Sequence, residues 1–208
     1  MSQRRVRHHV NPFGVHYLQR AVERLDLPTD REIDVELGCA DARFLFELAR
    51  QFPLRLHLGL EIRQPMVEQV NEEASAEGLT NLRALFAHIN IDFDRMFPDH
   101  SVHRIYINFP DPWFKTRHKK RRLVNEELVE VLHRKLRPDG ELFFQSDIFD
   151  FALDAMDCIE QSPLFVNADE PWHFRRPNPY PARSLREFFC DRDGVRVWRM
   201  LYRPVPNT

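Results

Sequence analysis

Short strand-like runs alternate with helix-like segments along most of the chain, and this alternation limits the possible folds more than any other feature. Residues 54–61 (LRLHLGLE) carry leucine at every second position, which is typical of a strand with one buried face. Residues 41–52 instead carry apolar residues at helical spacing. Strands and helices that alternate in this way predict βαβ units, and therefore an α/β fold with a mostly parallel sheet.

The two kinds of periodicity also predict where the elements begin and end. The expected strands are at 31–37, 54–61, 82–87, 102–109, 141–147 and 195–203, and the expected helices are at 41–52, 65–77, 123–136 and 149–160. A turn at 138–140 should close the third of these helices. Residues 161–194 are rich in proline and arginine and are predicted to be irregular, as a lid or a substrate loop would be. We therefore expect an N-terminal arm and first helix at 1–30 and a single domain at 31–208.

Composition excludes several classes of protein. The chain has 208 residues, which is enough for one core without metal or disulfide support. Its three cysteines are far apart and form no CxxC pair, which predicts no metal site and a reducing, cytoplasmic setting. No run approaches the roughly 18 apolar residues of a membrane span, and the basic start lacks the apolar stretch of a secretory signal. Nothing points to an obligatory protein partner, and both a monomer and a homodimer remain open.

Glycine and charge narrow the choice of ligand. With only six glycines, the chain contains neither a G-x-G-x-x-G fingerprint nor a Walker A loop. The net charge is −2, so a nucleic acid would have to bind to a local basic patch.

Candidate ligand-binding residues follow the predicted strands, because ligands of an open parallel sheet bind outside the carboxyl ends of its strands. The first strand leads into Glu36 and Gly38, and the second ends at Glu61. A carboxylate at the end of the second strand can accept both hydroxyls of a ribose, which predicts a nucleotide-type cofactor. The alternative is that both acids are ordinary strand-end charges that face water.

The segment 108–122 (NFPDPWFKTRHKKRR) is the most unusual stretch of the chain. Two prolines stiffen the backbone on either side of Asp111, and Trp113 could stack on a base. Six basic residues follow within eight positions, which is typical of a phosphate-binding surface: Lys115, Arg117, Lys119, Lys120, Arg121 and Arg122. The alternative, a solvated basic loop, is disfavoured by the rigid corner that precedes the charges.

Two further acidic positions have both a functional and a structural interpretation. Asp147 ends the strand at 141–147, beside Asp111 if the two strands are neighbours, but it could equally cap the helix at 149–160. Ser184 and Glu187 have the S-x-x-E spacing of a helix capping box. From the residues alone both interpretations stay open.

The motifs together resemble those of bacterial tRNA (guanine-N7-)-methyltransferases, which methylate a guanine of the tRNA variable loop with S-adenosylmethionine. The similarity is strongest in FPDPWFKTRHKKRR at 109–122, continues through RPDGELFFQSD at 137–147, and covers about residues 31–205. It implies a Rossmann-like, S-adenosylmethionine-dependent methyltransferase fold with a seven-stranded sheet, mostly parallel with one antiparallel strand near the end.

The resemblance also assigns roles to residues. It implies that Asp111 is catalytic and that the cofactor is bound by Glu36, Gly38, Glu61, His88 and Asp111. The substrate-binding positions that it implies are Lys115, Asp147, Ser184 and Glu187. The RNA-binding positions that it implies are Arg117, Lys119, Lys120, Arg121 and Arg122.

This chain departs from the family pattern at four of these places. Ala40 and Ala42 replace two glycines of the family's E-x-G-x-G-x-G loop, His88 replaces an acid or amide, and Arg186 replaces an aromatic residue. The expected function is methylation of guanine N7 in tRNA. Three alternatives are an RNA-binding relative with weak or lost activity, a methyltransferase for another substrate, and a nicotinamide-dependent oxidoreductase. The last lacks its glycine fingerprint and leaves the basic segment without a role.

Overall fold

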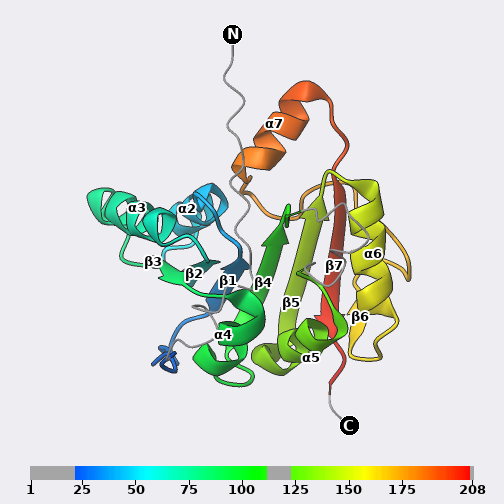
Figure 1. Cartoon of the computed structure of the whole chain (residues 1–208), viewed down its shortest axis with the longest axis horizontal. Coiled ribbons are helices and arrows are strands. Elements are labelled where there is room, and N and C mark those ends of the chain that lie inside the picture. The colour runs from blue at the N-terminus through cyan, green and yellow to red at the C-terminus, as the bar shows by residue number, and fades with distance from the viewer. Residues whose placement is uncertain (1–21, 112–122, 207–208) are drawn as a thin grey trace.

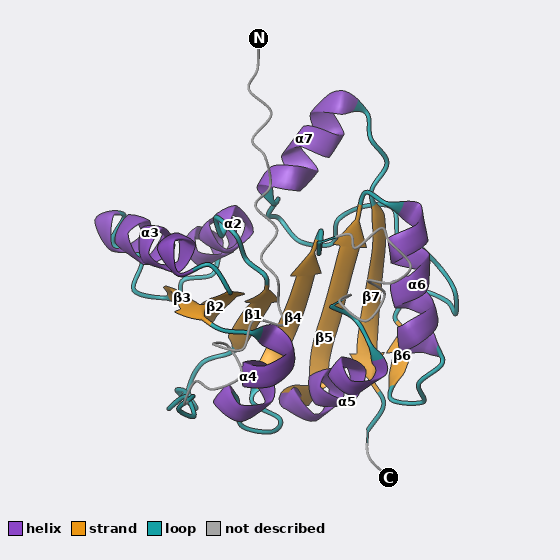
Figure 2. Ribbon diagram, in the orientation of Figure 1, coloured by secondary structure: helices purple, strands orange, loops and turns teal. Residues whose placement is uncertain are grey.

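A seven-stranded sheet forms the centre of the molecule (Figures 1 and 2). The computed structural model describes residues 22–111 and 123–206. The strands are β1 (Ile33–Leu37), β2 (Leu56–Glu61), β3 (Leu82–Phe86), β4 (Val102–Asn108), β5 (Leu136–Ser146), β6 (Phe165–Asn167) and β7 (Trp198–Pro204). Their order is β3-β2-β1-β4-β5-β7-β6, and the first five are parallel. Strand β7 runs antiparallel to both β5 and β6, so the expected α/β sheet is confirmed.

Helices cover both faces of this sheet (Figure 2). The covering helices are α2 (Arg43–Gln51), α3 (Gln64–Ala76), α4 (Ile89–Met96), α5 (Glu126–Lys135) and α6 (Phe149–Glu160), and a further helix, α7 (Leu185–Asp193), lies beyond the strand ends. Helices α2 and α3 pack on one face through a cluster that includes Phe44 and Val67. Helices α4, α5 and α6 pack on the other face through Phe93, Leu132 and Met156. Two separate apolar layers thus hold the sheet between them.

Most of the predicted elements are present, with shifted ends. Helix α5 begins at Glu126 because the side chain of Asn125 caps it, accepting a hydrogen bond from the Leu128 amide at 2.8 Å. Strand β5 begins at Leu136 and passes through residues 138–140, where the sequence predicts a turn. A register shift in the ladder between β4 and β5 accommodates this segment.

The prediction that residues 161–194 are irregular holds for 168–184 but not for the whole stretch, because β6 and α7 form on either side of that segment. The chain between them is anchored on the sheet by Tyr180, whose ring lies 5.0 Å from that of Tyr106 and 5.2 Å from that of Phe143. Helix α4 was also not predicted. These elements depend on contacts with distant strands that local periodicity does not reveal.

The N-terminal region is described only in part. Residues 22–30 form no helix, and the Leu25 amide donates a hydrogen bond to the Met96 carbonyl at 2.8 Å. The rest of the predicted arm and first helix lies in residues 1–21, outside the described part of the chain. Among the described helices, none has the length and apolar character needed to cross a membrane.

Candidate functional site

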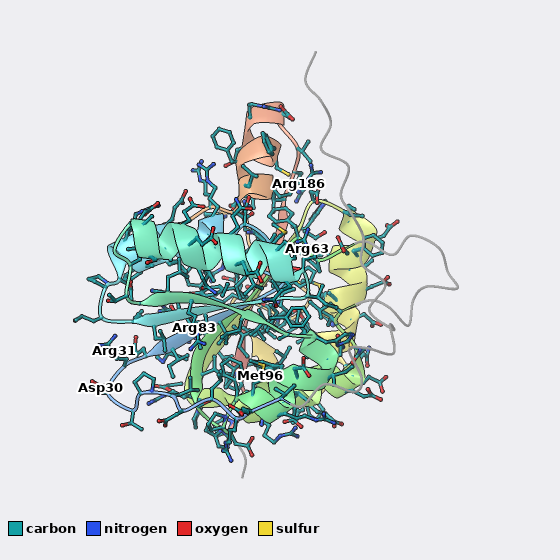
Figure 3. The ribbon with its side chains drawn as sticks, turned by 60° about the vertical axis from the view of Figure 1, so that its left-hand side comes forward. Asp30, Arg31, Arg63, Arg83, Met96 and Arg186 are labelled. Carbon is teal, nitrogen blue, oxygen red and sulfur yellow. The ribbon has the colours of Figure 1, made fainter. Side chains whose placement is uncertain are left out.

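The carboxyl ends of β1, β2, β4 and β5 meet at one edge of the sheet because these strands are parallel. Helix α7 lies over the same edge (Figure 1). In Figure 3, Arg63 and Arg186 lie toward this edge of the sheet, whereas Asp30 and Arg31 lie toward the opposite edge. The described residues that sequence reasoning selected after β1, β2, β4 and β5 therefore lie toward one region of the molecule.

Glu36, near the end of β1, is buried, with only 2% of its surface exposed. Its Oε1 accepts a hydrogen bond from Asn108 Nδ2 at 2.8 Å. Its Oε2 is also buried but takes no hydrogen bond from any described residue. Burial raises the pKa of Glu36 to about 8, and the nearby Asp41 and Glu61 add to this effect. The alternative of a strand-end charge facing water is therefore wrong for Glu36, which presents an unused acceptor instead.

Glu61, at the end of β2, is also buried, so it is not a water-facing charge either. Its Oε1 accepts from the backbone amide and Nε of Arg63 at 2.9 and 2.8 Å. Its Oε2 accepts from Arg63 Nη2 at 2.8 Å and from the Ala40 amide at 3.1 Å. Four donors therefore occupy the lone pairs of this carboxylate, and a ribose would have to compete with the Arg63 side chain.

The loop between β1 and α2 keeps a glycine-like conformation although two of its residues are alanines. Gly38, Ala40 and Ala42 all have positive φ angles, of 82°, 50° and 50°. Residues with a Cβ atom rarely adopt this region. The loop is also held by close packing, because a Cβ on Gly59 of β2 would lie 2.5 Å from Cys39 Sγ. Ala40 and Ala42 therefore adopt a backbone conformation that carries local strain for a residue with a Cβ atom.

His88 follows β3 and is the residue at the N-cap of α4. It is buried, and its backbone amide donates to Asp92 Oδ2 at 2.8 Å. Its position at the end of a strand next to β2 is the one expected of a group near the base of a nucleotide cofactor.

Asp111 follows β4 and is exposed at the edge of the sheet. The hydrogen bond to Glu61 is the main cause of the raised pKa of Arg63, and the charge of Asp111 adds to it, which places Asp111 and Arg63 within electrostatic reach of each other. The preceding Phe109 has a φ of 50°, an outlier for an aromatic residue. Its ring packs with Cys190 of α7 and Val197. The strained corner thus joins the end of β4 to helix α7.

Asp147 directly follows β5 and is paired with Arg186 of α7, whose Nε lies 2.9 Å from Asp147 Oδ2. The guanidinium makes a second, closer contact with the same oxygen through Nη2. The alternative that Asp147 caps α6 is wrong, because the N-cap residue is Ile148 and no side chain caps this helix. Because β4 and β5 are neighbours, Asp147 and Asp111 follow adjacent strands.

Ser184 caps α7, since its Oγ accepts from the Glu187 amide at 3.2 Å. Glu187 does not complete a capping box; its side chain is buried, with 1% exposed. Arg199 Nη2 donates to its Oε1 at 2.7 Å, and Gln145 Nε2 donates to its Oε2 at 3.0 Å. The capping role predicted for Ser184 is therefore confirmed, but the one predicted for Glu187 is wrong. Glu187 instead belongs to a hydrogen-bond network with residues of β5 and β7.

The predicted basic surface lies outside the described residues. This applies to Lys115 and to the RNA-binding positions Arg117, Lys119, Lys120, Arg121 and Arg122, as well as to Trp113. Their roles remain predictions. Among the described residues, no group of three or more histidine, cysteine or acidic side chains is arranged to hold a metal ion.

Comparison with known proteins identifies the family. A family model described as a putative methyltransferase matches residues 30–199. A tRNA (guanine-N(7)-)-methyltransferase of Synechocystis sp. is 37% identical and covers 99% of this chain and 100% of its own length. One of the same name from Synechococcus elongatus is 35% identical, with 99% of both chains covered. The chain belongs to the tRNA (guanine-N7-)-methyltransferase family.

Solved structures support the same fold. The 16S rRNA methyltransferase KamB superposes with a TM-score of 0.61, at 19% identity, over 90% of this chain and 97% of that one. A SAM-dependent methyltransferase from Aquifex aeolicus gives a TM-score of 0.56 at 14% identity, over 85% of each chain. The Rossmann-like methyltransferase fold expected from the sequence is therefore confirmed.

S-adenosylmethionine is the cofactor of this family, and the donors and acceptors at the sheet edge fit it. The unused, buried Oε2 of Glu36 is an acceptor of the kind that an amino acid ammonium group requires. Glu61 lies where a ribose would meet the second strand, and its carboxylate accepts hydrogen bonds from Arg63. Such a cation beside Glu36 would favour its charged form and lower its pKa.

Sequence reasoning missed four residues that form hydrogen bonds with the predicted site residues: Arg63, Asn108, Gln145 and Arg199. A usable signal exists for the three strand residues. Each lies two positions from a buried apolar residue on the same face of its strand, so each is a polar group where alternation predicts an apolar one. Arg63 gives no such signal.

Proposed function

We propose that this protein transfers a methyl group from S-adenosylmethionine to N7 of a guanine in the variable loop of tRNA. The similarity to tRNA (guanine-N(7)-)-methyltransferases along the whole chain is the observation that carries this proposal. The arrangement of acids at the sheet edge supports it. We further propose that the reaction takes place in the cytoplasm.

Guanine N7 carries a free lone pair, so no proton has to be removed before methylation. When bound, S-adenosylmethionine would supply an electrophilic methyl group on a sulfonium, which N7 would take up with S-adenosylhomocysteine as the leaving group. The protein therefore has to hold and orient its ligands rather than act as a strong base. This explains why the site needs acids but no catalytic histidine or lysine.

The proposed roles follow from position. Glu36 Oε2 accepts from the amino group of the cofactor, and Glu61 accepts from its ribose hydroxyls. Asp111 and Asp147, on adjacent strands, accept from the N1 and N2 donors of the guanine and so aim N7 at the methyl group. Asp147 has to exchange its contact with Arg186 for the base. The basic segment 115–122 holds the tRNA phosphates.

The test is methyl transfer from labelled S-adenosylmethionine to unmodified tRNA, followed by nucleoside analysis. We expect label in 7-methylguanosine. Asp111→Ala should abolish turnover without changing the melting temperature, whereas Asp157→Asn, an exposed acid on α6, should leave both unchanged. Label in another nucleoside would refute the substrate assignment. Binding of tRNA without binding of S-adenosylhomocysteine would instead favour a relative that has lost activity.

A further inference from the structure

A row of polar side chains crosses the sheet just below the ligand-binding edge. Asn108 on β4 is the register partner of Gln145 on β5, and Gln145 is the partner of Arg199 on β7. Their exposed fractions are 8%, 0% and 8%. The next row on the same face is apolar and made of Tyr106, Phe143 and Leu201. Burying polar side chains is costly, so this row has to be matched by hydrogen bonds.

Hydrogen bonds connect the row from one end to the other. Arg199 Nε donates to Gln145 Oε1 at 3.1 Å, and Gln145 Nε2 donates to Asn108 Oδ1 at 2.9 Å. Asn108 Nδ2 donates to Glu36 Oε1 at 2.8 Å. The hydrogen bonds therefore all run in one direction, from Arg199 on β7 toward Glu36 on β1, so that each can polarise the next.

The Arg199 end of the row fixes the orientation of both amides. A guanidinium can only donate hydrogen bonds. Gln145 must therefore turn its oxygen to Arg199, which leaves its amide nitrogen for Asn108 and for Glu187 Oε2 at 3.0 Å. Asn108 must then turn its nitrogen to Glu36. A change at Gln145 thus has a direct consequence at Glu36, although no hydrogen bond joins the two.

Helix α7 is tied to this row through Glu187. This carboxylate receives hydrogen bonds from Gln145, from Arg199 and from Asn178 Nδ2, the last at 3.0 Å to Oε1. Glu187 lies in the first turn of α7, three residues after the cap Ser184 and next to Arg186, the partner of Asp147. Ser184 and Glu187, the predicted substrate-binding positions that form the substrate motif of α7, are therefore held in part by the same amide that orients Asn108 toward Glu36.

We propose that Asn108 and Gln145 are positioning residues that couple the cofactor-binding carboxylate Glu36 to the substrate motif on α7. They touch neither ligand and act through Glu36 and Glu187. The inference rests on the proposed function for the role of α7, but its link to Glu36 concerns cofactor binding alone. Binding of the cofactor at Glu36 therefore changes the affinity for the substrate at α7, and the reverse, because both sites depend on the orientation of the same two amides.

The test uses the Gln145→Glu substitution in the full-length protein. The new side chain is nearly the same size, but it accepts where the amide donated. Asn108 then has to rotate to satisfy it and turns its own oxygen toward Glu36, which disfavours the charged form that binds the cofactor. We expect the dissociation constant of S-adenosylhomocysteine, measured by calorimetry, to rise about fivefold or more. Gln161→Glu, the same change at an exposed position after α6, should leave it unchanged.

A double-mutant cycle separates this coupling from loosened packing. In an Asn108→Ala background, Gln145→Glu should cause no further loss of affinity, because the residue that transmits the change is gone. If the two substitutions caused independent structural defects, their fold-changes in the dissociation constant would instead multiply. If Gln145→Glu does not fold, as judged by circular dichroism, the neutral Gln145→Met takes its place and has to show the same dependence on Asn108. An unchanged affinity in a folded Gln145 variant, or multiplied effects, would overturn the proposal.

Methylation assays on the same variants keep the two proposals apart. The KM for tRNA should rise with Gln145→Glu, because Glu187 loses a donor that fixes α7. If wild-type protein forms no 7-methylguanosine while the binding cycle behaves as expected, the tRNA assignment is wrong and the coupling to Glu36 stands. If 7-methylguanosine forms but substitutions of Gln145 leave the affinity for S-adenosylhomocysteine unchanged, only the proposed coupling is wrong.

Discussion

Replacing Ala40 by glycine is expected to stabilise the fold. Ala40 has a φ of 50°, in the left-handed region. This conformation costs a residue with a Cβ roughly 1–2 kcal/mol. Glycine avoids that cost but loses about 0.4–1 kcal/mol through the greater freedom of the unfolded chain. The balance is a gain of about 0.5–1 kcal/mol in the free energy of unfolding for Ala40→Gly.

Ala42 provides a matched comparison, because its φ is also 50°. The difference between the two residues is burial. Ala42 is completely buried in the cluster beneath α2, whereas Ala40 is only half-buried. Ala42→Gly would also remove a buried methyl group, which contributes about 0.8 kcal/mol. The relief of strain and the loss of packing should nearly cancel, so we expect almost no change in stability.

Equilibrium unfolding in urea, followed by circular dichroism, measures both differences against wild type. The slope of the free energy against urea should stay constant, since neither change alters the surface exposed on unfolding. The reasoning would be refuted if Ala40→Gly lowered the free energy of unfolding, or if Ala42→Gly stabilised the protein as much as Ala40→Gly does. Either result would mean that the loop is not strained at these alanines.

Three further predictions concern the cofactor site. Burial raises the pKa of Glu36 from 4.5 to about 8, so the folded protein holds this proton more tightly than the unfolded chain and loses stability as the pH rises between these values. Glu36→Gln should remove that loss, so the variant should melt at a higher temperature than wild type at pH 8.5. It should also bind S-adenosylhomocysteine much more weakly. A difference in melting temperature that does not depend on pH would contradict this prediction. Gly59→Ala places a Cβ 2.5 Å from Cys39 Sγ, so it should lower the free energy of unfolding in urea by about 1–3 kcal/mol and weaken cofactor binding. If neither quantity changed, Cys39 would have to be able to move aside. Arg63→Ala frees acceptor positions on Glu61 and should tighten S-adenosylhomocysteine binding by up to about fivefold in calorimetry, the equivalent of a partly exposed ion pair. Weaker binding would mean that Arg63 itself holds the cofactor.

The residues that meet at the sheet edge could be chosen from the sequence because of one geometric rule. Parallel strands end at the same edge, so the residues after each strand come together whatever the details of packing. Glu36, Glu61, Asp111 and Asp147 were selected in this way, and the structure places each of them at this edge. The ends of the strands were less well predicted: β5 begins at Leu136 instead of residue 141, and β7 begins at Trp198 instead of residue 195.

The sequence by itself determined the parallel α/β sheet, the acids at its carboxyl edge and the family, because these depend on local periodicity and on contiguous motifs. The tertiary structure alone decided which partners those acids take. Asp147 is paired with Arg186, 39 residues away in sequence, and Glu187 is buried against Gln145 and Arg199, 42 and 12 residues away. Hydrogen bonds between segments far apart in the chain form only once strand order and the course of the loops are fixed. Local alternation can therefore mark a buried polar residue, but it does not identify the partner of that residue.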